Sequence, residues 1–406
     1  MLLTDDAPIR EQRPYHLAQW AEQAERSVLR QMIDVVSRPD ILSFAGGLPA
    51  LELFPQEAYA EAMARVLHDD ARALQYGPPY KPLKEQIVAL MAQRGVSCTL
   101  QQVFITTGAQ QALDVLTRLL LNPDGEVLLE EVVYTGMQQA LAPHGPRILP
   151  VSTDLQEGMD VDVVERWLTT GARPAFIYAI PEAHNPLGVS LSAERRERLV
   201  GLAQRYGLPI IEDDPYGFLS DGETPPPLRA LNEEWVFYVG SFSKILAPAL
   251  RLGWIVAPEA LAPQLTVAKE ACDLESSALT QRAVAAFLQA GHLPGHLSRL
   301  REAYGRRRRA MLASLAQHFP AEARWTEPTG GMFVWVALPP GVDTVALLER
   351  TIAEEEVAFI PGHAFAIPGC QANHCLRLNF SNATVAQIED GIARLGRVIG
   401  EWLIRD

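Results

Sequence analysis

The stretch Trp235-Val236-Phe237-Tyr238-Val239-Gly240-Ser241-Phe242-Ser243-Lys244 joins an apolar, strand-like run to two hydroxyl side chains and a lysine. Arg251 follows seven residues after that lysine. An amine that attacks a carbonyl has to be held rigidly and kept partly deprotonated. A phosphate beside it needs hydroxyl and guanidinium donors. Because one short segment offers all of these groups, it suggests a lysine that forms a Schiff base with pyridoxal 5'-phosphate (PLP).

The composition is that of an ordinary globular protein. The chain has 406 residues, 48% apolar and 21% charged, and this length predicts two domains. Its net charge of −14 argues against nucleic acid as the main partner, because an acidic surface repels the phosphate backbone. The first 13 residues carry charges and no signal-peptide core, and no window reaches the roughly 20 apolar residues of a membrane span. We therefore expect a cytoplasmic enzyme without a membrane partner.

The histidines and cysteines do not indicate a metal site. The four cysteines are too few and too scattered for a disulfide framework. Cys370 and Cys375 lack a second ligand pair at zinc-like spacing. His292 and His296 stand four residues apart, but no carboxylate or third ligand accompanies them. We expect no metal.

Seven short β-rich runs alternate with helical stretches in the middle of the chain. The runs cover residues 103–106, 127–129, 147–151, 175–180, 209–212, 235–239 and 253–256. Nearly continuous apolar strands separated by amphipathic helices, such as 112–121 and 192–206, indicate a mostly parallel sheet that is covered on both faces. The catalytic residues of such sheets lie at the carboxyl ends of the strands.

The pattern changes after about residue 290, where a long polar helix over 297–319 precedes an α+β tail. We therefore predict an α/β fold. A large PLP-binding domain over 51–290 carries a mostly parallel, seven-stranded sheet flanked by helices, and a smaller α+β domain covers 291–406. Residues 1–50 form an N-terminal segment that packs with the smaller domain and the substrate site.

Polar residues follow two of the predicted strands. The protein has to position PLP and tune its electronics, and a carboxylate keeps the pyridine nitrogen protonated. Asp213 and Asp214 follow the strand 209–212, and Tyr216 comes shortly after them. Asn185 ends another strand, so that a phenol and an amide can both bond the ring oxygen of the cofactor. Alone each signal is weak, because Asp-x-x-Tyr also caps ordinary turns.

A second group of phosphate-binding residues is predicted directly after the first strand. Residues 106–111, Thr-Thr-Gly-Ala-Gln-Gln, link that strand to a helix expected to begin near Gln111, and helix N-termini bind phosphate. The glycine lets the backbone approach the anion closely. The segment could also be an ordinary turn, but together with Ser241, Ser243 and Arg251 it would complete one phosphate-binding site. Tyr134 is placed to stack on the cofactor ring, or is an ordinary half-buried tyrosine.

Taken in sequence order, these features resemble the fold-type I PLP enzymes, specifically the class I/II aminotransferases. The closest resemblance is to the subgroup of 2-aminoadipate, kynurenine and broad-range aromatic and branched-chain aminotransferases, from about Arg30 to the end of the chain. The motifs that carry it are Ser43-Phe44-Ala45-Gly46-Gly47-Leu48-Pro49, Leu53-Phe54-Pro55, Tyr76-Gly77, Thr106-Thr107-Gly108, Glu212-Asp213-Asp214-Pro215-Tyr216, Ser241-Phe242-Ser243-Lys244 and Leu376-Arg377-Leu378-Asn379-Phe380.

The resemblance implies a role for each cofactor residue. Lys244 would be the Schiff-base lysine and the acid/base that moves a proton between the substrate Cα and the cofactor C4'. Asp213 would pair with the pyridinium, and Asn185 and Tyr216 with the ring oxygen, while Tyr134 stacks on the ring. The phosphate would be held by Gly108, Ala109, Gln110, Ser241, Ser243 and Arg251.

The resemblance also implies how substrate and partner are bound. Arg377 would grip the substrate α-carboxylate as a bidentate fork, with Asn185 beside it, and Gly47 would let the substrate approach. Tyr76 would reach the cofactor of a neighbouring subunit, which implies a homodimer with shared sites. Arg30 lies where adipate-type members recognise a side-chain carboxylate, or is a surface arginine.

Departures from the family pattern leave the substrate open. His184 stands where glutamine is common, Leu187 replaces the usual threonine, and the usual proline is missing from Glu131-Val132-Val133-Tyr134. None of these changes removes a cofactor contact, but each could alter the pocket.

We expect ping-pong transamination of an L-amino acid with a 2-oxo acid. Glutamate and 2-oxoglutarate would form one pair, and 2-aminoadipate, an aromatic or a branched-chain amino acid would belong to the other. An alternative is a C–S lyase or decarboxylase on the same fold. A ligand-sensing regulator is a further alternative, but it needs an N-terminal DNA-binding domain of at least about 50 residues, and only about 40 residues precede Ser43.

Overall fold

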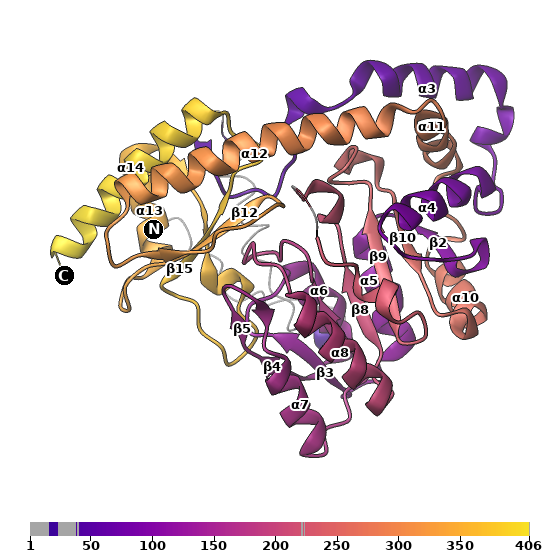
Figure 1. Ribbon diagram of the computed structural model, residues 1–406, viewed down its shortest axis with the longest axis horizontal. Helices are drawn as coiled ribbons and strands as arrows, with labels where there is room; N and C mark the ends of the chain where they lie inside the picture. The colour runs from indigo at the N-terminus through magenta and orange to yellow at the C-terminus, as the bar shows by residue number, and fades with distance from the viewer. Residues whose placement is uncertain (1–15, 23–37, 39, 221, 223, 406) are drawn as a thin grey trace.

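A seven-stranded sheet forms the centre of the larger part of the molecule (Figure 1). The computed structural model describes residues 16–22, 38, 40–220, 222 and 224–405. The strands, in their order across the sheet, are β2 (Val103–Thr106), β10 (Gly253–Val256), β9 (Val236–Ser241), β8 (Ile210–Asp213), β7 (Ile177–Ala179), β3 (Glu126–Glu130) and β4 (Arg147–Val151). These are the seven runs expected from the sequence, so the predicted α/β fold is confirmed.

Only β10 runs against its neighbours; the other pairs are parallel. Because β10 is antiparallel to both β2 and β9, these two strands share one direction. The carboxyl ends of β2, β9, β8 and β7 therefore lie at the same edge of the sheet. The residues that follow these ends are the ones expected to bind the cofactor.

Side chains alternate between the two faces of the sheet. On one face Tyr178, Ile211 and Phe237 pack in an apolar cluster with α5 (Ala109–Leu120), α6 (Thr135–Leu141) and α10 (Ala262–Asp273). On the other face Ile177 and Ile210 pack under α7 (Val161–Thr169) and α8 (Ala193–Tyr206). Further helices around this sheet are α3 (Gln56–Asp69), α4 (Lys81–Gln93), α9 (Leu228–Leu231) and α11 (Ala278–Gln289).

A second, four-stranded sheet is entirely antiparallel. Its order is β11 (Arg324–Trp325), β12 (Phe333–Ala337), β15 (Cys375–Asn379) and β14 (Ile360–Pro361). Figure 1 shows it beside α13 (Thr344–Glu355) and α14 (Val385–Arg405), with the long helix α12 (His292–His318) running from the first sheet toward α14. Helix α12 begins five residues earlier than expected from the sequence, so Pro294 lies in its first turn, where a missing backbone N–H is tolerated.

Residues 42–44 take part in a separate two-stranded sheet and are joined to the second sheet by a hydrogen bond. Strand β1 (Leu42–Ser43) pairs in parallel with β13 (Val357–Ala358). The Phe44 amide donates to the Ala358 carbonyl at 2.8 Å, and the Asn379 amide donates to the Phe44 carbonyl at 2.8 Å. Further short elements include α1 (Gln19–Glu22) and the pair β5 (Thr153–Asp154) and β6 (Gly158–Met159).

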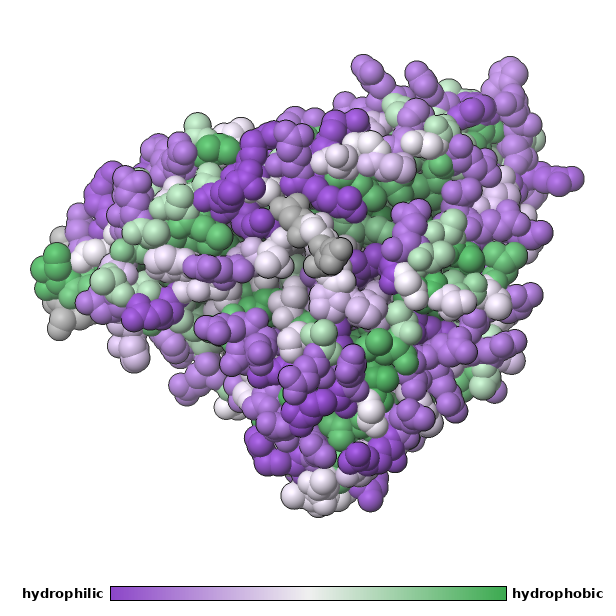
Figure 2. Space-filling view, viewed as in Figure 1, coloured by the Kyte–Doolittle hydropathy of each residue, from purple (hydrophilic) through white to green (hydrophobic). Residues whose placement is uncertain are grey.

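Hydrophilic residues dominate the face shown in Figure 2, with smaller apolar areas between them. In the described part of the chain, every helix is too short or too polar to span a bilayer.

Gly240 allows the strand that leads to Lys244 to pair closely with β10. It lies directly opposite Trp254, whose buried ring covers it, and an added methyl group would overlap that ring. We expect Gly240→Ala to lower the free energy of unfolding by about 1–3 kcal/mol, since overpacking a core forces strain. Denaturant titration followed by circular dichroism measures this change.

Gly201 is the matched control for Gly240. It lies in the interior of α8 with open space around its Cα. Gly201→Ala should raise the free energy of unfolding by about 0.5–1 kcal/mol, because alanine loses less backbone entropy than glycine in a helix. A Gly240→Ala variant as stable as the parent protein would contradict the packing argument.

Candidate active site

Lys244 lies in the turn that follows β9. Its amine donates a 2.7 Å hydrogen bond to the carbonyl of Gly47, which belongs to the segment joined to the second sheet. Burial, together with the positive charges of Arg377 and Arg251, lowers the pKa of Lys244 to about 8. A larger fraction of this amine is therefore deprotonated near neutral pH than of an ordinary lysine.

Asp213, at the carboxyl end of β8, is a buried carboxylate with one oxygen free of protein partners. Its Oδ2 accepts a 2.7 Å hydrogen bond from the hydroxyl of Tyr178, whereas its Oδ1 is buried without a partner. Burial raises the pKa of Asp213 to about 7, and the Tyr178 hydrogen bond opposes that rise. A buried acceptor of this kind can receive a charged N–H from a ligand.

Asp214, in contrast, already accepts hydrogen bonds from protein donors on both of its carboxylate oxygens. Its Oδ1 accepts from the Gly217 amide at 2.7 Å, and its Oδ2 accepts from the hydroxyl of Tyr238 and from Arg94 Nη2, both at 3.1 Å. Because consecutive strand residues point to opposite faces, Asp214 turns away from α5 while Asp213 faces the side that α5 covers. The structure thus distinguishes the two neighbouring carboxylates, because only Asp213 keeps an oxygen without a protein partner.

The guanidinium of Arg377, on β15, is buried between two aromatic rings. Its centre lies 4.2 Å from the ring of Phe333 and 4.7 Å from that of Phe365. In the plane of the group, Nη1 donates to Asn185 Oδ1 at 2.8 Å and Nη2 donates to the Ala45 carbonyl at 2.6 Å. The two rings and two acceptors hold the cation in one orientation.

This cation has no carboxylate to neutralise it. Within the described residues Arg377 forms no ion pair, and its Nε is buried without a partner. Burial lowers the pKa of Arg377 to about 10, yet the group stays charged at neutral pH. A buried, positioned and unpaired guanidinium is suited to bind a carboxylate with two hydrogen bonds.

Tyr216 and Tyr134 lie among these charges. The buried ring of Tyr216 contacts that of Phe333 edge-on, with 6.0 Å between centroids, and burial raises its pKa. Burial and the nearby Asp213 raise the pKa of Tyr134, while Arg251 and Arg377 lower it. The tyrosines, the carboxylate and both arginines therefore belong to one cluster.

The predicted phosphate loop approaches the loop after β9 closely. Gly108 has a left-handed φ of 78°, and a Cβ on it would lie 2.6 Å from Arg251 Nη2. Arg251 Nη2 donates to the carbonyl of Thr107 at 3.3 Å. A Cβ on Gly253 would meet Ala109 N at 3.0 Å, so two glycines permit this approach. Helix α5 begins at Ala109, two residues before the expected start, with Gly108 as its N-cap.

The side chains of this loop are partly engaged with one another. The amide of Ser243 donates to Ser241 Oγ at 3.1 Å. Gln110 Nε2 donates to the Gly136 carbonyl at 2.8 Å, and its Oε1 accepts from the Tyr134 hydroxyl at 3.4 Å. The Gln110 side chain thus positions Tyr134 and leaves its backbone amide, at the start of α5, for an anion.

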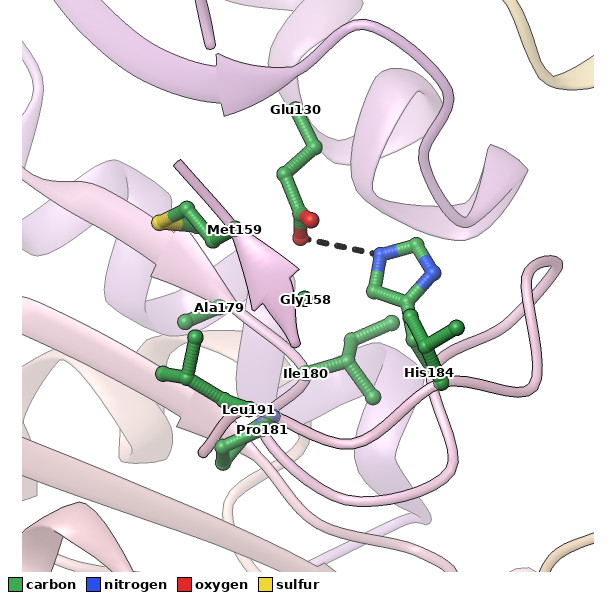
Figure 3. Close-up of a pocket in the computed structure, with 9 residues that line it drawn as sticks. Glu130, Gly158, Met159, Ala179, Ile180, Pro181, His184 and Leu191 are labelled. Atoms are coloured by element: carbon green, nitrogen blue, oxygen red, sulfur yellow. Dashed lines mark ion pairs between the residues drawn. The ribbon is translucent and has the colours of Figure 1, made fainter. Parts of the chain in front are cut away.

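His184, one of the departures from the family pattern, is buried opposite Glu130 (Figure 3). Its Nε2 lies 3.0 Å from Glu130 Oε2, although the two atoms are not aligned for a hydrogen bond, and the hydroxyl of Thr153 donates to Glu130 Oε1 at 2.6 Å. A cavity of about 10 Å³ beside the pair is lined by Met159, Ile180 and Leu191. This polar contact anchors the loop that carries Asn185.

One predicted site residue, Tyr76, is not part of this cluster. Tyr76 is 87% exposed, and Arg30 lies outside the described residues. Among the described residues no group of histidine, cysteine, aspartate and glutamate has the arrangement of a metal site.

Three further groups were missed by reasoning from sequence alone: Tyr178, the Ala45 carbonyl and Phe365. Tyr178 could have been found from strand register, since it pairs with Ile211 and so shares a face with Asp213 two residues later. No local pattern predicts that Ala45 or Phe365 contacts Arg377, because each meets it only through the tertiary fold.

The sequence between residues 39 and 395 matches the family model of aminotransferase class I and II. The chain belongs to this family. It is 41% identical to a 2-aminoadipate transaminase of Thermus thermophilus, covering 93% of this chain and 95% of that protein. It is 38% identical to aromatic-amino-acid aminotransferase 1 of Thermococcus litoralis, covering 92% of each. A crystal structure of kynurenine aminotransferase from Pyrococcus horikoshii, in complex with PMP, superposes with a TM-score of 0.90 at 36% identity, covering 95% and 97% of the two chains.

The expected activity and cofactor are thereby confirmed: this is a PLP-dependent aminotransferase. The observed site fits the cofactor. The unpartnered Oδ1 of Asp213 suits a protonated ring nitrogen, and the glycine-lined approach of Gly108 to Arg251 suits a phosphate. Lys244 supplies a buried amine of lowered pKa. The role of each single residue stays a prediction.

The pKa of Lys244 predicts how fast PLP attaches to the apoenzyme. Below pH 8 the deprotonated fraction of the amine, and with it the attachment rate, should rise about tenfold per pH unit. The rate should level off above pH 8, because the pKa is about 8. Stopped-flow absorbance measures it, and Nα-acetyl-lysine corrects for the titration of PLP itself. A rate that still rises tenfold per unit between pH 9 and 10 would contradict the lowered pKa.

Proposed function

We propose that this aminotransferase exchanges amino groups between glutamate and 2-oxoglutarate on one side and 2-aminoadipate, an aromatic or a branched-chain amino acid on the other. The buried, unpaired guanidinium of Arg377 carries this proposal, because an α-carboxylate is the group that every amino acid and 2-oxo acid shares. The named activities of the relatives from Thermus, Thermococcus and Pyrococcus support the substrate classes.

Each residue then has a proposed part in binding. PLP, when bound, supplies an electron sink for the bonds at the substrate α-carbon. Asp213 would hold a proton at the ring nitrogen, Asn185 and Tyr216 would bind the ring oxygen, and Tyr134 would stack on the ring. The phosphate is held by Gly108, Ala109, Gln110, Ser241, Ser243 and Arg251. Arg377 orients the substrate carboxylate between its two aromatic neighbours.

Lys244 moves the proton in this proposal. Its amine lies 2.7 Å from the carbonyl of Gly47, which is on the segment that also supplies the Ala45 acceptor for Arg377. A lysine whose pKa is about 8 can both take a proton from the substrate Cα and return it at the cofactor C4' near neutral pH. Gly47 has no room for a side chain, since a Cβ would lie 2.9 Å from Phe333, and so it leaves the approach to the site open.

We also propose that residues 51–290 form the cofactor-binding domain and 291–406 the smaller domain, with residues 1–50 packed against the latter. The hydrogen bonds of Phe44 to Ala358 and Asn379 support this division. A cytoplasmic location is proposed as well, in keeping with the four free cysteines.

A substrate panel tests the proposed activity. Purified holoenzyme should form glutamate from 2-oxoglutarate with 2-aminoadipate, leucine, phenylalanine or kynurenine as donor. Lys244→Ala should lower turnover by at least about a hundredfold, because a positioned acid/base contributes that much or more. Release of ammonia or carbon dioxide without any 2-oxo acid would instead favour a lyase or a decarboxylase.

The same panel tests Arg30. If Arg30 binds the side-chain carboxylate of the substrate, Arg30→Ala should lower kcat/KM for 2-aminoadipate far more than kcat/KM for leucine. Equal losses of kcat/KM for the two substrates would contradict that role.

We propose a homodimer in which Tyr76 enters the partner's site. Tyr76 is 87% exposed, Leu74 75% and Leu51 72%, and exposed apolar groups of this kind mark protein interfaces. Mixing Tyr76→Ala with Lys244→Ala chains should restore activity, because one of the two hybrid sites then contains both intact residues. A mixture no more active than its components, in a solution shown to contain hybrid dimers, would contradict shared sites.

A further inference from the structure

Two buried tyrosines on strands that flank β8 donate hydrogen bonds to two consecutive carboxylates. Tyr178, on β7, donates to Asp213 at 2.7 Å, and Tyr238, on β9, donates to Asp214 at 3.1 Å. All four side chains are buried. The two interactions lie on opposite faces of the sheet, because Asp213 and Asp214 alternate in direction.

The two carboxylates differ in how much they depend on their tyrosine. Asp214 keeps two other donors, the Gly217 amide and Arg94, when Tyr238 is discounted. Asp213 accepts from no other donor within the described residues, and its second oxygen has no partner. Tyr178 alone therefore fixes the direction of the Asp213 carboxylate.

Tyr178 also affects the charge of Asp213. Burial is the largest influence and favours the neutral acid, as does the adjacent Asp214, whereas Tyr178 and His184 favour the carboxylate. Tyr134 and Tyr216 are the other titratable groups that face it. A neutral Asp213 would attract a proton to a ring nitrogen far less strongly than a carboxylate.

The position of the Tyr178 ring suits it to orient the Asp213 carboxylate. It belongs to the apolar cluster covered by α5 and α6, and it is only 1% exposed. Tyr178 pairs with Ile211 across the β7–β8 ladder, so its side chain extends along the same face as Asp213. A phenylalanine would retain this packing and lose only the hydroxyl.

We propose that Tyr178 is a positioning residue that occupies Oδ2 of Asp213 and thereby presents Oδ1, ionised, to the ring nitrogen of the cofactor. The proposal deepens the proposed function and rests on the role assigned there to Asp213. Tyr178 touches neither substrate nor cofactor in this account; it acts only through the carboxylate.

The test is ¹⁵N NMR of holoenzyme loaded with PLP labelled at the ring nitrogen, together with the Kd of PLP for each apoenzyme. Tyr178→Phe should move the ring-nitrogen resonance toward its unprotonated position. It should also raise the Kd roughly tenfold, as expected for loss of a hydrogen bond to a charged group. Tyr238→Phe is the matched control, a buried tyrosine on the other flanking strand, and should leave the resonance in place and the Kd within about twofold.

The outcomes distinguish a failure of the role proposed for Tyr178 from a failure of the role proposed for Asp213. Asp213→Asn should shift the resonance at least as far as Tyr178→Phe; if it does not, the role proposed for Asp213 is wrong. If Asp213→Asn shifts the resonance and Tyr178→Phe leaves resonance and Kd as in the parent enzyme, the role of Tyr178 is overturned. Should Tyr178→Phe fold poorly, 3,5-difluorotyrosine at position 178, a stronger donor of nearly equal volume, should keep the nitrogen protonated and bind PLP at least as tightly. Weaker binding with an unprotonated nitrogen would overturn the proposal.

Discussion

The burial of the Arg377 guanidinium is the constraint on which the active site depends. Its two in-plane acceptors come from separate parts of the chain, Asn185 after β7 and Ala45 in the segment before residue 50. Of its two aromatic neighbours, Phe333 belongs to the second sheet and Phe365 to a short 3-10 helix, Gly362–Phe365. Removing a charge from water is costly unless its hydrogen bonds are satisfied. The cation therefore favours the one arrangement in which these segments meet around it.

The same burial explains why the site is ready for a carboxylate. Two carbonyl-type oxygens and two rings stabilise the cation without cancelling its charge, so an anion that enters completes the ion pair. The charge also acts at a distance, because Arg377 is the second cause of the lowered pKa of Lys244 after burial. The substrate binding proposed for Arg377 and the lowered pKa of Lys244 are thus linked through one side chain.

Much of the site could be read from the sequence because its residues follow strands. Lys244, Asp213 and Gly108 each come just after an apolar run, and parallel strands bring such positions to one edge of a sheet. The choice between Asp213 and Asp214 agrees with the family pattern, but its physical reason, three donors on one carboxylate and one on the other, appears only in the structure. The Glu130–His184 pair is a similar case, since its members lie 54 positions apart in the sequence.

The sequence by itself determined the alternation of strands and helices, the family and the cofactor chemistry, because short-range patterns of apolar residues, glycines and hydroxyls carry that information. Only the tertiary structure decided which carboxylate keeps a free oxygen, which aromatic rings enclose Arg377 and which tyrosine orients Asp213. These features depend on strand register and on contacts between distant segments. A one-residue change of register would turn Tyr178 to the opposite face of the sheet, without altering any local motif.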